Sequence, residues 1–319
     1  MTRLAVQNAV GVAFLGVVSA QQTLTAAEAD VQRREVLARA AHTLADNQLR
    51  PGAEASRADA ELAAARTRAI QARQAVIVST TTLGRVLGIA DGSSVTVSTA
   101  RLLDAAAPDT PAAGAVPPHP LVQSEQAAVD LARARETVLA KTDRPRLYLQ
   151  SSVSARGSGA NPDRPFDGGV DGLGLERANW AAGVQVVFPN LFDFATLRGR
   201  RAAASALTRA EDARYEEAVL TVRSEQRTAD AVVDAARAIA QNTPIQLAAA
   251  RQSEAQARAR YDAGLAGITE VAEAQNLLAG AEYQDAAARV EVWRALLARA
   301  VAQGSLAPFV DLLRVAGGQ

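Results

Sequence analysis

The sequence offers few groups that could carry out covalent chemistry or bind a metal. It contains no cysteine, which excludes disulfides, thiolate metal sites and a cysteine nucleophile. Its two histidines, His42 and His119, lie far apart and have no partner at the spacing of metal ligands, so we interpret both as surface or turn residues. We find no phosphate-binding glycine loop and no nucleophile–base set. The protein is therefore predicted not to be an enzyme and to need no cofactor or metal.

The most suggestive charged groups are two carboxylates, Glu270 and Glu273, which follow a glycine turn at Gly264. From residue types alone, the simpler interpretation is a pair of solvated helix charges. Basic and acidic residues balance at 34 each, and no segment has the basic excess typical of nucleic-acid binding, so no nucleic-acid partner is expected.

The two carboxylates lie within a pattern of long amphipathic helices. Apolar residues alternate at spacings of three and four over residues 1–47 and 52–88, and the same period holds over 193–262 and 266–304. Arg50-Pro51-Gly52 separates the first pair and Ala263-Gly264-Leu265 the second, so each pair is predicted to form an antiparallel hairpin. The apolar seam of the second helix consists of Leu62, Ala65, Ala69, Ala72, Val76, Ser79, Leu83 and Val86.

The first helical segment admits two interpretations. Residues 4–20 are largely apolar, follow Arg3 and end in Val-Ser-Ala, as a short signal peptide does. The apolar seam nevertheless continues across this point through Val17, Ala20 and Leu24, and a cleaved leader has no reason to stay in register with the following helix. We favour a helix; a native N-terminus at Gln21 would favour the signal peptide. No run of about 20 uninterrupted apolar residues is present, so a transmembrane helix is not expected.

The middle of the chain changes its period. Residues 92–117 are rich in Ala, Pro, Ser and Thr and are predicted to be a linker, after which a helix opens at His119-Pro120-Leu121 and runs to about Thr142. Residues 145–189 then alternate with a period of two on either side of a loop rich in Gly, Asp and Pro, which predicts a β-hairpin. Polar residues such as Gln150, Ser152, Ser154 and Gln185 alternate with the apolar face. That face consists of Leu147, Leu149, Val153, Trp180, Val184, Val186 and Phe188.

A gapless internal repeat relates the two helical hairpins. Shifting the first by 216 positions places Asp46 on Asp262, Glu54 on Glu270 and Gly88 on Gly304. Alanine matches are weak support in an alanine-rich chain, and two heptad helices always align in some register. The distance from turn to helix end matches as well as the phase, and we therefore favour a duplication.

Four motifs together resemble the TolC-like outer-membrane efflux proteins. The turn Arg260-Tyr261-Asp262-Ala263-Gly264-Leu265 is similar to the family's second periplasmic helix turn. The segment Trp180–Gly183 followed by Pro189-Asn190-Leu191-Phe192 is similar to a strand that leaves the barrel and enters a long helix. The remaining motifs are His119-Pro120-Leu121, at the start of the second repeat, and the hairpin ends Leu87-Gly88 and Gln303-Gly304.

The resemblance implies a mainly α fold of long antiparallel α-helical hairpins of the α-barrel type, with one β-hairpin that contributes to a transmembrane β-barrel. Residues 1–91 would be the remainder of a first repeat and residues 118–319 a complete second repeat, with the β-hairpin at about 145–189 and the helix pair at 193–304. Met1 would then be an internal start, a truncated gene or an error in the gene prediction. An in-frame extension upstream of Met1 with a leader and another alternating hairpin would confirm the truncation.

The resemblance also implies a function. We expect a subunit of a homotrimer in the outer membrane that extends into the periplasm of a Gram-negative-type cell. It would be a passive duct for small molecules in a tripartite pump, with a periplasmic adaptor, an inner-membrane pump and outer-membrane lipid as partners. The apolar strand face would meet lipid and the polar face water.

Two sets of site residues follow from the same resemblance. Glu270 and Glu273 would line the periplasmic aperture and favour cations. Ala263, Gly264 and Leu265 would contact the adaptor. The first-repeat turn, from Gln48 to Gly52, lacks this residue pattern, and the first-repeat counterparts of the two glutamates are Glu54 and Arg57, so the sequence predicts two unlike tips.

Two other functions remain open at this stage. A periplasmic adaptor or coiled-coil scaffold also uses long helical hairpins, but it would need a domain inserted between the arms, and the helix over 193–262 leaves no room for one. A secreted helical binding protein would require residues 4–20 to be a signal peptide. The sequence does not distinguish drug efflux, metal efflux and protein secretion.

Overall fold

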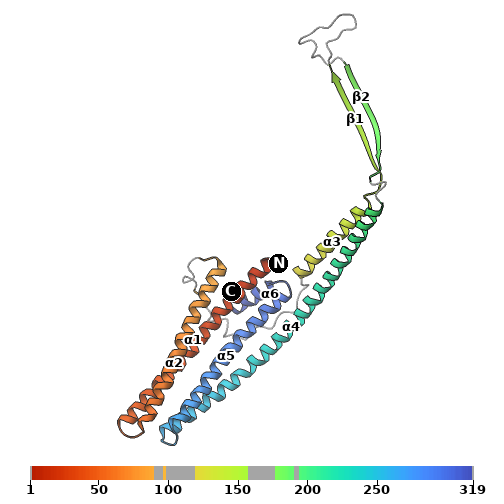
Figure 1. Cartoon of the computed structure of the whole chain (residues 1–319). Helices are drawn as coiled ribbons and strands as arrows, with labels where there is room; N and C mark the ends of the chain where they lie inside the picture. The colour runs from red at the N-terminus through yellow and green to blue at the C-terminus, as the bar shows by residue number, and fades with distance from the viewer. Residues whose placement is uncertain (1, 90–95, 98–118, 157–176, 190–193, 318–319) are drawn as a thin grey trace, which may run out of the picture. The chain divides into compact units, whose positions relative to one another are not determined.

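The computed structural model describes residues 2–89, 96–97, 119–156, 177–189 and 194–317 (Figure 1). These residues form two compact units, Met1–Gln123 with Ala218–Gln319 and Ser124–Glu217. In chain order the elements are α1 (Thr2–Asp46), α2 (Gly52–Leu87), α3 (Pro120–Ala140), β1 (Arg146–Arg156), β2 (Arg177–Val187), α4 (Phe194–Asp262), α5 (Ile268–Ala302) and α6 (Ala307–Gly317). The long helices, the strand pair and the helix ends agree with the predicted pattern to within a few residues. The predicted linker, 92–117, lies almost wholly outside the described residues.

The first helical hairpin, α1–α2, packs through the seam that the sequence predicts. Ala65, Ala69, Ala72 and Leu83 of α2 are buried, and the other seam residues are at least partly buried. Alanine at these positions lets the two helix backbones approach closely. Outside the seam α2 leaves large apolar side chains exposed, among them Ile77 at 62%.

Helix α1 is continuous across residues 17–24, as the helical interpretation predicts. Among the described helices it alone is long and apolar enough to cross a membrane, a criterion that signal sequences and core helices also meet. Three of its side chains, Leu15, Val17 and Val18, are fully buried within the helical unit.

The second hairpin, α4–α5, lies beside the first. Helix α5 carries the most extensively buried face of the chain, with Leu278 and Ala281 packed against Leu247 and Ala250 of α4. Its other side packs along α1, from Ile268 and Val271 near the turn to Leu297 farther up. Pro244 lies inside α4, which remains helical through this point. Figure 1 shows both hairpin turns at the same end of this unit.

The sequence analysis missed one helix, since it took the helix that ends near Gly304 to be the last. Helix α6 follows after a short turn in which Ser305 Oγ accepts a hydrogen bond from the Ala307 amide at 3.4 Å. Its side chains Phe309 and Leu312, with Leu306 of the preceding turn, pack in one cluster with Trp293 of α5, and the Trp293 and Phe309 rings meet edge-on at 6.3 Å. This cluster closes the core where α1 meets α5.

Two of the sequence motifs meet in space at the end of α5. Gly304 has φ +80°, and a Cβ built there would lie 2.7 Å from Pro120 Cδ and 2.8 Å from His119 Cδ2. Only glycine combines this backbone conformation with so close a contact. The start of α3 is therefore packed against the end of α5.

The second unit consists of α3, the first part of α4 and the strand pair. Polar contacts join α3 to α4: Arg133 pairs with Asp212 at 2.9 Å and Thr208 donates to Glu136 at 2.8 Å. Strands β1 and β2 pair antiparallel over 11 positions, from Arg146 opposite Val187 to Arg156 opposite Arg177. Phe188 lies one residue beyond β2, so the prediction that it belongs to the strand is wrong by one residue, because Pro189 ends the ladder there.

Candidate functional site

The turns of the two helical hairpins have the same backbone structure. Gly264 has φ +75° and Gln48, 216 positions earlier, has φ +58°. In the second turn the amide of Gly264 donates to Tyr261 O and that of Leu265 to Arg260 O, and in the first turn Gln48 donates to Ala45 O and Leu49 to Leu44 O. This pair of bonds is the Schellman motif that ends many helices. The two turns therefore share one backbone structure although their residue patterns differ, since Gln48 adopts the left-handed conformation without being glycine.

The far ends of the hairpins repeat the same motif. Gly88 donates to Arg85 O and Ile89 to Gly84 O, and 216 positions later Gly304 donates to Val301 O and Ser305 to Ala300 O. Turn, helix length and helix end thus recur together. This agreement supports the duplication more strongly than the matching residues do.

Side chains from the first tip reach the second. The Arg50 guanidinium donates to Ala266 O at 3.0 Å and lies over the Tyr261 ring at 5.1 Å from its centroid. Glu54 approaches Arg50 at 3.6 Å and accepts a hydrogen bond from the Tyr261 hydroxyl at 3.4 Å. Burial raises the pKa of Tyr261, and the neighbouring Glu54 charge raises it further.

The sequence analysis did not identify Arg50, Glu54 and Tyr261 as a group. The 216-residue offset could have pointed to this contact. It places residues 50 and 266 at equivalent positions of the two turns, and these residues are in contact. Their proximity is a contact between hairpins, which no local pattern encodes.

Glu270 and Glu273 lie on one face of α5, beside α4. Glu270 pairs with Arg260 at 3.2 Å, and Glu273 is exposed. Both line a polar groove of about 320 Å³ between the two helices. Glu54, the first-repeat counterpart of Glu270, is instead largely covered by Arg50 and Tyr261. The two repeats therefore present their carboxylates differently.

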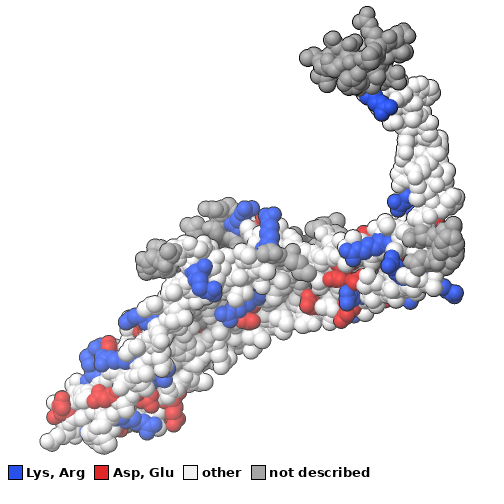
Figure 2. All heavy atoms as spheres, turned by 45° about the horizontal axis from the view of Figure 1, so that its top comes forward, with Lys and Arg blue, Asp and Glu red and all other residues white. Residues whose placement is uncertain are grey.

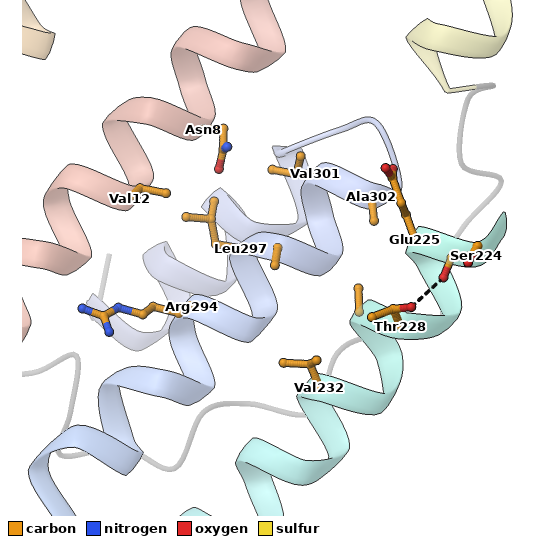
Figure 3. A pocket seen from close by; sticks show the side chains of 12 residues that line it. Asn8, Val12, Ser224, Glu225, Thr228, Val232, Arg294, Leu297, Val301 and Ala302 are labelled. Atoms are coloured by element: carbon orange, nitrogen blue, oxygen red, sulfur yellow. Dashed lines mark hydrogen bonds between the residues drawn. The ribbon is translucent and has the colours of Figure 1, made fainter. Parts of the chain in front are cut away.

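A second groove lies farther up the same unit, with α5 as its floor (Figure 3). It measures about 620 Å³, and Leu297 and Val301 give it an apolar base. Its walls come from equivalent positions of the two repeats, since Val12 of α1 and Thr228 of α4 are 216 residues apart. Helix α5 is thus flanked by two copies of the same helix.

The strand register places the predicted lipid-facing residues on one face. Leu147 lies opposite Val186, Leu149 opposite Val184, and Val153 opposite Trp180. These side chains are 50–83% exposed, so the described residues of the second unit do not cover them. The opposite face carries the polar residues, and Gln150 donates to Gln185 at 2.8 Å.

Charged side chains are confined to the ends of the strand pair. Within β1 and β2 they are Arg146, Arg156 and Arg177, each at a strand terminus. In the view of Figure 2 the hairpin is uncharged between its two ends. A one-sided apolar ribbon without internal charges is a large exposed patch of the kind that marks an interaction with a membrane or with another chain.

Comparison with known proteins agrees with these features. The sequence profile of the outer membrane efflux protein family matches residues 117–304. The chain belongs to that family. A search of curated protein sequences gives no significant match.

Solved structures share the fold at low sequence identity. The outer-membrane channel OprN is 21% identical with a TM-score of 0.74, and the match covers 95% of this chain and 66% of that one. VceC of Vibrio cholerae is 17% identical with a TM-score of 0.75, and the match covers 95% of this chain and 70% of that one. CusC is 15% identical with a TM-score of 0.79, and the match covers 95% of this chain and 69% of that one. The chain thus spans about two thirds of the length of these channels.

The family match identifies the chain as a TolC-like outer membrane efflux protein, and the similar structures share its fold. The family and the similar structures are channels rather than enzymes. No cluster of three or more metal-binding side chains occurs in the part of the chain that the structure describes. Helix α4 runs unbroken from Phe194 to Asp262 and contains no inserted domain, which the adaptor alternative requires.

Proposed function

We propose that the chain is a wall segment of a trimeric duct through which small molecules leave the periplasm passively. The observation that carries this proposal is the strand pair, whose 11-residue strands have apolar side chains on one face and charges only at their ends. Strands of about 9–11 residues, tilted in the bilayer, span its apolar layer. Leu147, Leu149, Val153, Trp180, Val184, Val186 and the adjoining Phe188 then face lipid. A closed barrel needs partners on both edges of this hairpin, and other hairpins of the assembly supply them.

The paired helix tips form the periplasmic mouth in this proposal. Glu270 and Glu273 lie on one face near the tip of α5, and three copies bring six carboxylates to one entrance. Because Arg260 neutralises part of the Glu270 charge, Glu273 carries more of the field that favours cations. The aperture is thus a filter by charge, with no covalent step.

The tips also form the docking point for a periplasmic adaptor, which links the duct to an inner-membrane pump. Leu265 and its counterpart Leu49 are 73% and 69% exposed at equivalent places in the two turns. Ala263, Gly264 and Leu265 therefore have a structural equivalent in the first repeat. A trimer would present six similar turns to such an adaptor.

Reconstitution into planar bilayers tests the proposal. The expected result is an ion-conducting pore whose reversal potential in a salt gradient shows cation preference. The double variant Glu270→Gln/Glu273→Gln lowers that preference. Glu291→Gln, an exposed carboxylate farther up α5, is the matched control and leaves it unchanged. Protein that inserts but conducts no ions contradicts the duct; a pore whose selectivity is unaffected by the double variant contradicts the aperture assignment alone.

A further inference from the structure

A cluster of charged side chains is buried between α1, α2 and α5, well away from the tips. Asp30 and Arg34 of α1 are 0% and 1% exposed. Arg34 Nε donates to Asp30 at 2.9 Å, and its two terminal nitrogens donate to Glu61 of α2 and Asn276 of α5 at 2.8 and 2.7 Å. One guanidinium thus joins three helices.

Two further arginines extend the cluster. Arg68 of α2 donates to Asp30 at 2.9 Å, and Arg33 of α1 forms a two-pronged ion pair with Glu282 of α5 at 3.1 and 2.6 Å. The contacts to Glu282 and Asn276 cross from the first repeat to the second.

The cluster is not explained by stability. Removing charges from water is costly, and a well-packed apolar replacement of a buried ion pair is often as stable or more stable. The Nε atoms of Arg33 and Arg68 are also buried without a hydrogen-bond partner among the described residues. The best-attested role of such buried polar groups is to specify one helix register over others.

The second repeat lacks the cluster. Its positions equivalent to Asp30, Arg34 and Glu61 are occupied by Gln246, Ala250 and Leu277, respectively. Helix α4 nevertheless packs on α5 through an apolar contact that includes Ala250. The α4–α5 hairpin therefore forms without this cluster, although it holds one buried carboxylate, Asp285, which accepts a hydrogen bond from Thr243. The contact that distinguishes α1 is the one it makes with α5.

Register is determined differently within a hairpin and between hairpins. Within α1–α2 and α4–α5 a tight turn fixes how the two helices align. No turn joins α1 to α5, because residues 47–267 lie between them in the chain. Near the tips the contact combines the small side chains Ala38 and Ala41 with Leu37, Ile268 and Val271. Apolar contacts of this kind are less specific than paired charges when one helix slips by a turn, about 5.4 Å.

We propose that the cluster of Asp30, Arg33, Arg34, Asn276 and Glu282 fixes the axial register between the two repeats and so holds their tips at one level. A slip of one turn separates Arg34 from Asn276 and Arg33 from Glu282, and leaves charges buried and unpaired. It also moves Arg50 away from Ala266, since both depend on the same alignment. The inference concerns register alone and does not rest on the proposed duct.

Spin-label distances test the proposal, because the chain contains no native cysteine. Labels at Leu49→Cys and Ala287→Cys span the two hairpins mainly along the helix axis and report slippage. Labels at Leu265→Cys and Ala287→Cys lie within one hairpin and serve as the internal reference. Labelled chains are diluted with unlabelled ones, so that only distances within a chain are measured. The unaltered chain is expected to give one narrow distribution for each pair.

The decisive variant replaces the cluster by apolar side chains of similar size: Asp30→Leu, Arg33→Met, Arg34→Met and Glu282→Met. Its net charge is unchanged. We expect retained helicity, and for the 49–287 pair a broadened distribution or a second peak displaced by about 5 Å, one helical turn. The 265–287 distance stays fixed. A narrow 49–287 distribution at its original position overturns the proposal.

A matched control removes the same number of charges elsewhere in α1–α2. The variant Glu28→Gln, Glu35→Gln, Arg66→Gln, Arg73→Gln eliminates two exposed ion pairs and is expected to leave both distances unchanged; if it broadens the 49–287 distance equally, the proposal is overturned. If the apolar variant loses its helicity, Arg34→Lys decides, since lysine cannot reach Asp30, Glu61 and Asn276 together. Broadening of the 49–287 distance then supports the register role, and an unchanged distribution overturns it.

Discussion

The two hairpin tips share one backbone but hold it with different side chains. The second tip places glycine at its left-handed position, and the first places Gln48 there at φ +58°. The first tip supplies Arg50, which reaches across to Ala266 O and Tyr261, whereas the second supplies Arg260, which pairs with Glu270 of its own hairpin. The two repeats thus share the hydrogen-bonded turn but differ in the charged side chains around it.

The difference separates the roles of the two tips. The charged side chains of the first tip are used in contacts with the second tip, since Glu54 and Arg50 are largely covered there. The second tip keeps Glu273 exposed and Glu270 only weakly paired. Any electrostatic function at this end therefore depends mainly on the second repeat.

The largest effect is expected from placing a β-branched residue at the left-handed position. Gly264→Val is predicted to destabilise the α4–α5 turn by about 2 kcal/mol, because a branched side chain is strained at positive φ. Hydrogen exchange of the amides of residues 263–265 measures this. Leu265→Val, at an exposed position that does not have positive φ, is the control. Equal protection in the two variants contradicts the assigned backbone.

Next in size is the comparison of the two arginines. Arg50→Ala removes a charged hydrogen bond and a cation–π contact and is predicted to cost about 1.5–2 kcal/mol. Arg260→Ala removes one exposed ion pair and is predicted to cost less than about 0.5 kcal/mol. Chemical denaturation of both variants under the same conditions gives the difference. A larger loss for Arg260→Ala would reverse the assignment of roles.

A smaller effect of opposite sign is expected at Gln48. Glycine adopts the left-handed conformation freely, so Gln48→Gly is predicted to stabilise the α1–α2 turn by about 1 kcal/mol. The reciprocal Gly264→Gln is predicted to destabilise its turn by a similar amount. Hydrogen exchange of both turns checks the pair, and a destabilising Gln48→Gly would show that the glutamine side chain makes a contact outweighing its strain.

The smallest effect is a pH dependence of the tip. The pKa of Tyr261 is raised above 10.0, so folding favours its neutral form. The associated stability is complete below pH 10 and is lost as the pH rises through the folded-state pKa. Tyr261→Phe, which cannot ionise, is expected to weaken this loss in denaturation curves recorded between pH 9 and 11. If the variant loses stability between pH 9 and 11 as steeply as the unaltered chain, the role assigned to Tyr261 is contradicted.

Much of the fold could be predicted from the sequence because it is built from long periodic elements. The α2 seam and the alternation that puts Leu149 and Val184 on one strand face are local patterns that packing then uses. Helix α6 was missed although apolar residues such as Phe309, Leu312 and Leu313 recur there at helical spacing, because the segment is short and follows Gly304, which ends the preceding helix. The Arg50–Tyr261 contact and the Asp30–Arg34 cluster depend on helices brought together from distant parts of the chain, and no local period predicts them.

The paired-tip architecture requires the two repeated tips to lie side by side within one chain. In the cysteine-free protein, Arg50→Cys and Ala266→Cys occupy equivalent positions that are in contact. A short bifunctional thiol reagent is predicted to join them efficiently within one chain, which changes mobility without forming dimers. The pair Arg50→Cys and Ala287→Cys, separated along the helices, is predicted to remain unlinked. Efficient linkage of the second pair, or no linkage of the first within a chain, would contradict the paired-tip architecture.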